Sequence, residues 1–374
     1  MKVGIPLEIR EFEQRVAVTP ETVKKIIALG CEVIVEKGAG IGANITNAAY
    51  EQAGARLTEA KDTFSCPLVL KVRAPEAKEI KLMKKGTVLI GMLEPFNQTN
   101  SQAMAKQGLT AFSLEALPRN TRAQSMDVLS SQANIAGYKS VLLASHFYQH
   151  FMPMLMTAAG TVKAARVLVL GAGVAGLQAI ATAKRLGAVV EASDVRPAVK
   201  EQIESLGAKF LDVPYETEEE AKIAAGQGGY ASAMPAAWMK RQADLVAARA
   251  AESNIVITSA LIPGRAPPIL LHSETVAKMK PGSVVIDLAA GLGENGSGNC
   301  PLTEANKVVI KNGVTLVGYT NLPSMVSADA SALYARNVFE FMKLIVAEGK
   351  INLPSEDELV KACLLCSDGN ITKK

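Results

Sequence analysis

A glycine-rich segment in the second half of the chain has the residue types and the spacing to bind a dinucleotide. Gly171, Gly173 and Gly176 form a G-x-G-x-x-G pattern directly after the apolar run 166–170, and a run with helical spacing follows. In such a turn the first glycine allows the tight bend, the second lets the backbone approach a pyrophosphate, and the third lets helix and strand pack closely. The pyrophosphate then meets the positive end of the helix. The pattern therefore predicts a dinucleotide site, and no metal site is predicted.

An acidic residue in the right place indicates which dinucleotide this is. Asp194 ends the next expected strand, about 20 residues after the glycines, where a carboxylate accepts hydrogen bonds from a ribose 2′-hydroxyl and repels a 2′-phosphate. The cofactor expected is NAD(H). Arg196 bears the other way, because an arginine nearby can hold the extra phosphate of NADP(H). We assign Asp194, Val195 and Arg196 to the cofactor site.

A second polar segment, LPRNTRAQSMDVLSSQANIAGY at 117–138, shows neither helical nor alternating apolar spacing. Two interpretations are open. It can be an ordinary interdomain turn held by hydrogen bonds of its Asn, Asp and Ser side chains, or a loop that presents polar groups to a ligand. From the residue types alone, the turn is the simpler interpretation.

The length and the strand pattern predict how these segments are positioned. A chain of 374 residues is long enough for two domains. In the first ~115 residues, β-rich runs (KVGI, CEVIVEKG, LVLKV, TVLIGML, LTAFSLE) alternate with helical ones, and PETVKKIIALG has Thr19 as N-cap, Pro20 in the first turn and Gly30 as its stop. Residues 134–152 have helical spacing and are long enough to connect two domains. Six further strands follow: RVLVLGAG, AVVEASDV, AKFLDV, NIVITSAL, SVVIDLAA and VTLVGYT. This is the number that two mononucleotide-binding halves require.

The fold class expected is therefore α/β, with two domains that each contain a mostly parallel doubly wound sheet, the second being a Rossmann domain. We expect residues 1–135 and 321–374 to form the first, discontinuous, flavodoxin-like domain, because SADASALYARNVFEFMKLIV after Asn321 turns helical again. Residues 136–320 would form the Rossmann domain. A glycine-rich insertion at 217–235 is either a mobile lid beside the nucleotide or a plain surface excursion.

Composition excludes several other classes. The net charge of +4 comes from 40 basic and 36 acidic residues spread along the chain, so no basic block follows a nucleic-acid backbone. The N-terminus lacks the apolar region of a signal peptide, and the long apolar stretch 141–162 is interrupted by His146, Gln149, His150 and Pro153. We therefore expect a soluble protein without a membrane span. Five cysteines suggest free thiols in a reducing compartment, and the C-x-x-C pair, Cys363 and Cys366, lacks the partners of a zinc or redox site.

With these motifs placed, nearly the whole chain resembles the NAD(H)-binding subunits of proton-translocating nicotinamide nucleotide transhydrogenases, relatives of alanine dehydrogenase. RAQSMDVLSSQ with TAAGT is specific to the transhydrogenase branch, while RVAVTP and LVLKV are shared with alanine dehydrogenases. Further segments that carry the likeness are GAGIGANITNAAY, GAGVAGLQAIATAKRLGAVVEASDVR, TSALIPGRAPP, MKPGSVVIDLA and SADASALYARN.

The resemblance implies a role for the polar segment. In transhydrogenases an arginine-glutamine-aspartate loop lies beside the nicotinamide, and its matches are Arg119, Gln124, Asp127 and Ser130. A hydride moves only when donor and acceptor carbons approach to roughly 3–3.5 Å with aligned rings, so these side chains would orient ring, ribose and carboxamide. None needs to transfer a proton, because the cofactors supply the chemistry.

The resemblance also extends the cofactor site. Tyr230 matches a tyrosine on the family's mobile loop, which favours the lid over the plain excursion. The rim of the crevice would include Val174 and Ala175 at the turn and Ser259, Ala260 and Leu261 after the fourth Rossmann strand. The implied partners are an NADP(H)-binding subunit and a membrane-spanning subunit that passes protons, on the cytoplasmic face of a bacterial inner membrane, and the implied assembly is a homodimer.

Two alternatives remain. An amino-acid dehydrogenase of the alanine type, or a related saccharopine-type enzyme, needs a histidine as acid-base group beside a substrate-binding arginine and lysine. Arg15 and Lys71 match the last two, but the histidine position falls near Glu94. The second alternative is a non-enzymatic NAD sensor, for which the polar segment would be excessive.

Overall fold

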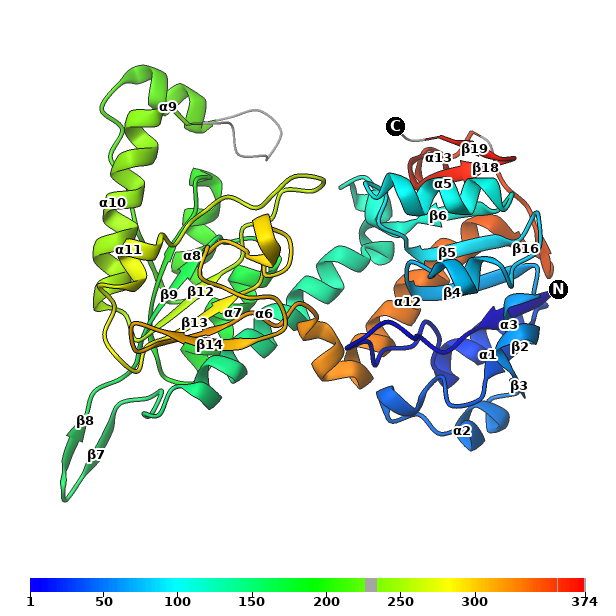
Figure 1. Ribbon diagram of the computed structural model, residues 1–374, viewed down its shortest axis with the longest axis horizontal. Coiled ribbons are helices and arrows are strands. Elements are labelled where there is room, and N and C mark those ends of the chain that lie inside the picture. The colour runs from blue at the N-terminus through cyan, green and yellow to red at the C-terminus, as the bar shows by residue number, and fades with distance from the viewer. Residues whose placement is uncertain (226–233, 355, 373–374) are drawn as a thin grey trace. The chain divides into compact units, whose positions relative to one another are not determined.

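The computed structural model describes residues 1–225, 234–354 and 356–372, which divide into two compact units (Figure 1). Unit 1 comprises Met1–Gln132 and Pro323–Lys374, and unit 2 comprises Ala133–Leu322. Each unit has its own sheet with buried side chains on both faces. Two mostly parallel sheets confirm the predicted α/β class.

The sheet of unit 1 has eight strands in the order β19-β18-β6-β5-β4-β1-β2-β3. Six are parallel, while β18 pairs antiparallel with β6 and β19 antiparallel with β18. The strands are β1 (Lys2–Ile5), β2 (Glu32–Glu36), β3 (Arg56–Thr58), β4 (Leu68–Arg73), β5 (Val88–Met92), β6 (Thr110–Ser113), β18 (Leu364–Ser367) and β19 (Asn370–Ile371).

The sheet of unit 1 contains one parallel strand that the sequence did not predict. From β3 to β6 the order reads 3-2-1-4-5-6, and the five predicted strands alone, without the edge strand β3, have the order 2-1-3-4-5 of a flavodoxin-like sheet. The flavodoxin-like assignment of the first domain stays a prediction. β3 was missed because it is a three-residue strand whose side chains are exposed or only half-buried, so it leaves no apolar run in the sequence.

Alternate side chains of the unit 1 strands face two separate cores. Leu68 and Leu70 pack in a core with α1 and α12, while Val69 packs in the other core with α3 and α5. Helices on both faces make the sheet doubly wound. The helices of this unit are α1 (Pro20–Ala28), α2 (Asn47–Gln52), α3 (Ala60–Phe64), α4 (Ala77–Ile80), α5 (Gln98–Lys106), α12 (Ser327–Ile345) and α13 (Glu358–Cys363), with 3₁₀ turns η1 (Ile41–Ala43), η2 (Leu114–Ala116), η3 (Thr121–Met126) and η6 (Leu322–Val326), and a small hairpin β16 (Val346–Ala347) and β17 (Lys350–Ile351).

The predicted ends of α1 are confirmed. Thr19 is its N-cap with extended backbone, Pro20 occupies the first turn, and Gly30 follows with φ +83°. Proline suits a first turn because its missing N–H would have no partner there, and glycine adopts the positive φ without a Cβ penalty.

The sheet of unit 2 has seven strands in the order β11-β10-β9-β12-β13-β15-β14. All six predicted strands are present and parallel, again in the order 3-2-1-4-5-6. The antiparallel edge strand β14 was not predicted, because its apolar run in the sequence is only three residues long and ends at Lys311. The strands are β9 (Arg166–Leu170), β10 (Val189–Ser193), β11 (Lys209–Phe210), β12 (Ile255–Thr258), β13 (Val284–Asp287), β14 (Val308–Lys311) and β15 (Val314–Val317).

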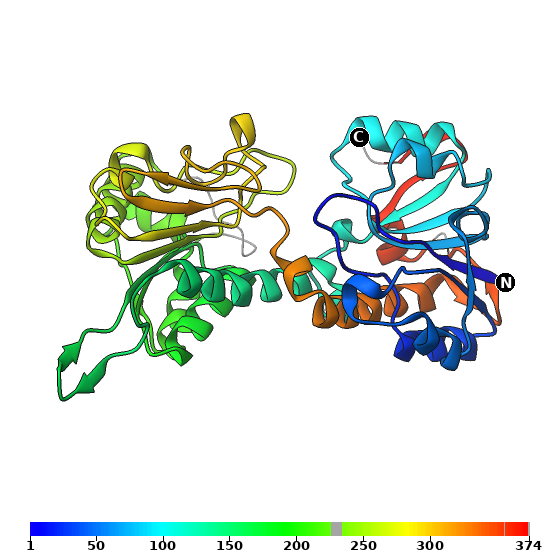
Figure 2. The ribbon, with the colours of Figure 1, turned by 60° about the horizontal axis from the view of Figure 1, so that its bottom comes forward.

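Helices also cover both faces of this sheet. One core joins α6, α7 and α8 to Val167 and Val169 of β9, and the other joins α10 and α11 to Leu168 and Leu170. A hairpin of β7 (Leu155–Thr157) and β8 (Gly160–Val162) extends away from the rest of unit 2 in both views (Figures 1 and 2). The helices are α6 (Val128–Phe147), α7 (Val174–Arg185), α8 (Lys200–Ser205), α9 (Glu218–Ala225), α10 (Ala236–Glu252) and α11 (Ser273–Val276), with 3₁₀ turns η4 (Pro197–Val199) and η5 (Glu294–Gly296).

Helix α6 begins earlier than the spacing predicts. It was expected at 134–152 but runs from Val128 to Phe147, so the second half of the polar segment 117–138 is helical. Asp127 precedes it, and its carboxylate accepts hydrogen bonds from the backbone N–H (2.9 Å) and the hydroxyl (2.5 Å) of Ser130. This N-cap starts the helix among polar residues, where apolar spacing gives no signal.

Part of the glycine-rich insertion 217–235 is helical. It contains α9, and residues 226–233 lie outside the described ranges. Among the last described residues, β18 adds a buried strand beside β6. Cys363 and Cys366 are fully buried in different cores and neither forms a disulfide.

Burial raises the pKa of Cys366 to about 11, so its thiol stays protonated near neutral pH. The described residues contain no cluster of His, Cys, Asp or Glu placed to hold a metal ion. Across the same ranges, none of the helices combines the length and the apolar character that a bilayer span needs.

Candidate functional site

The turn between β9 and α7 has the conformation that only glycine allows at two positions. Gly171 has φ +96°, and a Cβ there would lie 2.9 Å from the hydroxyl oxygen of Ser259. A Cβ on Gly176 would lie 1.9 Å from the carbonyl oxygen of Gly171, a collision with backbone that no rotamer relieves. The two glycines therefore set the tight turn and the close contact of helix and strand.

The middle glycine faces open space instead. A Cβ on Gly173 would meet no atom within 4 Å, and Gly173 is the N-cap of α7 without a side-chain capping bond. The first N–H groups of the helix and its positive end thus face a space that a side chain would fill. Val174 is exposed and Ala175 is half-buried at this end. The geometry fits a pyrophosphate, which places negative charge at such helix ends.

Asp194 lies directly after β10, beside this turn. Its Oδ2 accepts the N–H of Ala172 (2.7 Å) and the NH2 group of Arg196 (2.9 Å), while Oδ1 accepts the backbone N–H (2.8 Å) and Nε (2.9 Å) of Arg196. Burial alone raises the pKa of Asp194, but hydrogen bonds from Arg196 and Ala172 outweigh it and hold the pKa below its ordinary value. The carboxylate is therefore ionised, with Val195 half-buried between the paired residues.

The loop after β12 forms the other side of the turn. The N–H of Ser259 donates to the carbonyl of Leu170 (2.8 Å), and its hydroxyl donates to the carbonyl of Gly171 (3.0 Å). Ala260 is half-buried and Leu261 is exposed. The structure thus brings Ser259, Gly171 and Gly176 together at the carboxyl ends of β9 and β12, the edge at which doubly wound sheets bind ligands.

The polar segment belongs to unit 1 as far as Gln132. Arg119 and Gln124 are exposed, and Asp127 and Ser130 are half-buried in the N-cap of α6. Asp127 and Ser130 therefore contact each other, whereas Gln124 presents its amide to solvent from η3. The hydrogen bonds of a held turn are therefore present, and the presentation of polar groups to a ligand stays a prediction, with the exposed amide of Gln124 available for it.

Several anchors of this segment were missed in the sequence. Asn337 of α12 donates to the carbonyl of Ser125 (2.7 Å) and accepts the hydroxyl of Ser131 (2.7 Å). Arg122 forms an ion pair with Asp357, whose pKa it lowers. Since these partners lie more than 200 positions away in sequence, no local pattern could have identified them.

The predicted site residues thus fall into two groups, one in each unit. Arg119, Gln124, Asp127 and Ser130 belong to unit 1, and the turn, Asp194, Val195, Arg196 and the loop 259–261 belong to unit 2. Tyr230 lies outside the described residues.

The residues that an alanine-type enzyme would use are paired inside unit 1. Arg15 is buried and forms hydrogen bonds with both carboxylate oxygens of Glu13 (2.8 and 2.7 Å). Lys71 is buried between Glu8 (3.2 Å) and Glu79 (2.7 Å). After β5, the side chain in place of a histidine is Glu94, 2.6 Å from Arg10.

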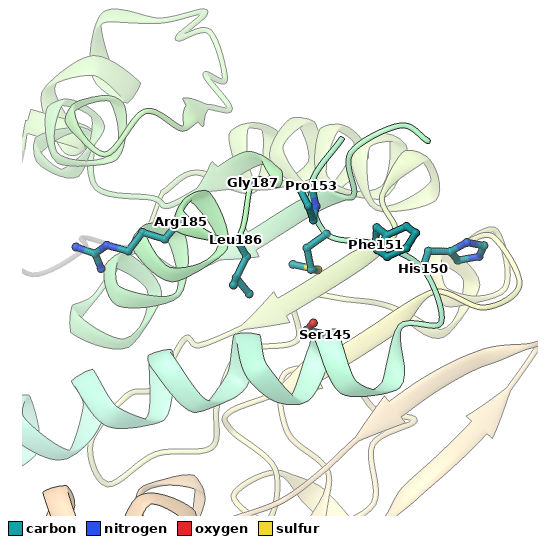
Figure 3. A pocket seen from close by; sticks show the side chains of 8 residues that line it. Ser145, His150, Phe151, Pro153, Arg185, Leu186 and Gly187 are labelled. Atoms are coloured by element: carbon teal, nitrogen blue, oxygen red, sulfur yellow. The ribbon is translucent and has the colours of Figure 1, made fainter. Parts of the chain in front are cut away.

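A surface pocket of about 540 Å³ lies elsewhere in unit 2, and Figure 3 shows Arg185 at one end and His150 at the other. Ser145 of α6 and Leu186 after α7 also line it. None of its lining residues belongs to the predicted site, so its size gives no support for a cofactor role.

The fold and the glycine turn define a doubly wound α/β protein with a dinucleotide-type site. The chain belongs to the alanine dehydrogenase/PNT family, whose N-terminal domain matches residues 4–136 and whose C-terminal domain matches residues 140–374.

Individual relatives confirm the resemblance predicted from the motifs. The chain is 49% identical to the first portion of the NAD(P) transhydrogenase alpha subunit of Rhodospirillum rubrum, over 99% of this chain and 97% of that one. It is 47% identical to a transhydrogenase of Sinorhizobium meliloti of known structure, with a TM-score of 0.86 and coverage of 99% and 98%. It is 28% identical to an alanine dehydrogenase of Halomonas elongata, over 100% of this chain and 95% of that one.

Proposed function

We propose that this chain is the NAD(H)-binding subunit of a proton-translocating NAD(P)⁺ transhydrogenase, in which a hydride passes from NADH to NADP⁺ bound on a partner subunit. The observation that carries the proposal is the side chain after β5, where Glu94 forms an ion pair with Arg10 (2.6 Å). An amino-acid dehydrogenase needs a proton-transferring histidine there, whereas transfer between two nicotinamides needs only orientation.

In the proposed site, the residues of unit 2 bind the dinucleotide. The open space at Gly173 and the positive end of α7 take the pyrophosphate, and Asp194 accepts a ribose hydroxyl. The bound nicotinamide supplies the hydride chemistry. The loop from Ser259 to Leu261 lines the crevice at the carboxyl end of β12.

The residues of unit 1 orient the ring. The exposed amide of Gln124 offers two donors and one acceptor, and Asp127 and Ser130 bond the carboxamide or its neighbours. Arg119 orients or bridges these groups. Because Asn337 bonds the carbonyl of Ser125 and the hydroxyl of Ser131, the backbone next to Gln124 is held in place before a ligand arrives, which reduces the entropy cost of alignment.

Partners complete the proposed enzyme. The NADP(H)-binding subunit supplies the second nicotinamide, and a membrane-spanning subunit couples the transfer to proton movement. This places the chain, as a homodimer, on the cytoplasmic face of a bacterial inner membrane. Tyr230, which lies outside the described residues, is part of the proposed cofactor site by its match to the family's tyrosine. The names of relatives that are called transhydrogenase subunit alpha support the multi-subunit arrangement.

An alanine dehydrogenase-like activity is the alternative. It is favoured by the 28% identity to an alanine dehydrogenase and by Arg15 and Lys71 at the matching positions. Both cations are buried with carboxylates, so a role in ion pairs that hold unit 1 together accounts for them.

One experiment separates the candidates. Purified chain is mixed with NADH and either pyruvate plus ammonium, or the NADP(H)-binding subunit plus an oxidised nucleotide analogue. Turnover only with the partner subunit is expected. Turnover with pyruvate would establish the amino-acid dehydrogenase, and tight NADH binding without turnover in either mixture would indicate a sensor.

A further inference from the structure

The loop that lines the nucleotide crevice after β12 is long and irregular. Residues 259–271 form neither helix nor strand, and residues 261–266 are exposed. Such a loop loses its conformation unless its backbone groups are fixed by partners. One buried residue, Asn299, supplies several of these partners.

Asn299 holds this loop at three points. Its Oδ1 accepts the N–H of Ala260 (3.2 Å), and its Nδ2 donates to the carbonyls of Ala260 (2.9 Å) and Pro268 (2.8 Å). Its own carbonyl accepts the N–H groups of Leu270 (2.9 Å) and Leu271 (3.1 Å). Because one amide binds both the N–H and the C=O of Ala260, it fixes the peptide planes on either side of that residue.

Asn299 is itself held by the last residue of β13. The buried carboxylate of Asp287 accepts the N–H groups of Asn299 (3.1 Å) and Cys300 (3.0 Å), and also the hydroxyl of Thr258 (3.1 Å). A Cβ on Gly298 would lie 2.5 Å from both carboxylate oxygens, so the backbone lies directly against them. Hydrogen bonds from Asp287 to Asn299 and from Asn299 to Ala260 thus connect the ends of β13 and β12 to the loop.

We propose that Asn299 is a positioning residue that sets the nicotinamide half of the dinucleotide crevice. This inference rests on the proposed function. In a doubly wound sheet each mononucleotide half binds one part of the dinucleotide, and Asp194 follows β10 in the adenosine half. Ala260 follows β12 in the other half, so the loop that Asn299 fixes faces the nicotinamide and its ribose. An asparagine suits this task because the side chain of an aspartate cannot donate hydrogen bonds to the two carbonyls, and the side chain of a leucine forms no hydrogen bonds.

The test measures the Kd of NADH and the Kd of ADP for variants of Asn299 and of a control residue, Asn254. Asn299→Ala and Asn299→Asp should each raise the Kd of NADH about tenfold, since the hydrogen bonds lost are those that orient the loop. The Kd of ADP, which fills only the adenosine half, should stay within about twofold. The matched control is Asn254→Ala, because Asn254 also fixes a backbone group, the N–H of Arg166 (2.9 Å), but at the amino ends of β9 and β12. That variant should lower the melting temperature without changing either Kd.

The outcomes separate this inference from the proposed function. Equal affinity of Asn299→Asp and wild type for NADH, or equal loss of NADH and ADP binding, overturns the positioning role. Should Asn299→Ala fail to fold, the ligand comparison on Asn299→Asp decides alone. A wild-type chain that does not bind NADH refutes the proposed function itself.

Discussion

The pair of Asp194 and Arg196 leads to an unintuitive prediction: removing the arginine should not weaken NADH binding. Two guanidinium bonds and two backbone N–H groups occupy the four lone-pair directions of the Asp194 carboxylate. An incoming ribose hydroxyl must therefore take the place of one of them. The backbone donors are fixed, whereas the Arg196 side chain is 28% exposed and can move away.

The expected change in nucleotide affinity depends on which hydrogen bonds of Asp194 each variant removes. Arg196→Ala removes a competitor and leaves the carboxylate, so NADH affinity should change by less than about threefold or improve. Asp194→Asn removes a charged acceptor, worth roughly 1.5–3 kcal/mol, so NADH affinity should fall by about 10- to 100-fold. It also removes the repulsion of a 2′-phosphate and frees Arg196 to bind one. The ratio of NADH to NADPH affinity should then fall on the order of 100-fold.

Fluorescence titration of NADH and NADPH against the two variants and the wild type measures the affinity of each protein for each nucleotide. Thermal melting shows whether each variant is folded. A folded Arg196→Ala variant that loses NADH affinity tenfold would show that the guanidinium itself holds the nucleotide. An unchanged NADH to NADPH ratio in Asp194→Asn would refute the role of the carboxylate.

Three further predictions concern the turn, the polar segment and the buried charges. Gly173→Ala should keep the melting temperature but weaken NADH binding, because its Cβ enters open space that the pyrophosphate needs. Gly176→Ala should lower the free energy of unfolding by about 1–3 kcal/mol in urea denaturation. A Gly176→Ala variant that melts at the wild-type temperature would contradict this second expectation. Gln124→Asn should slow single-turnover hydride transfer to the partner subunit by on the order of 100-fold, because the exposed amide retracts by about one bond, while the affinity for NADH stays unchanged. A loss of NADH affinity with a normal rate of hydride transfer would argue against the orienting role of Gln124. Burial raises the pKa of Glu8 above 4.5 despite the attraction of Lys71, so the folded state binds this proton more tightly and the resulting stability is lost as the pH rises through the raised pKa. Glu8→Gln, which does not titrate, should therefore gain unfolding free energy relative to wild type as the pH rises above the ordinary glutamate pKa of about 4.5. A difference in unfolding free energy that stays constant with pH in urea denaturation would show that the pKa is not raised.

The sequence alone determined those parts of the protein that depend on neighbouring residues. The glycine turn at 171–176, Asp194 after its strand, and the six Rossmann strands were predicted because steric limits at a tight turn and apolar runs in buried strands act over a few positions. The ends of α1 were predicted for the same reason, from Thr19, Pro20 and Gly30.

Only the tertiary structure decided the edges of the sheets and the support of the site. The edge strands β3 and β14, and β18 next to the edge strand β19, pair without a long apolar run, so their residues give little local signal. The segment around Gln124 is fixed by Asn337, which lies 206 positions from its partner Ser131, and Ala260 is fixed by Asn299, 39 positions away. Hydrogen bonds between distant residues exist only after the sheets and helices have packed, because packing alone brings such donors and acceptors within about 3 Å of each other.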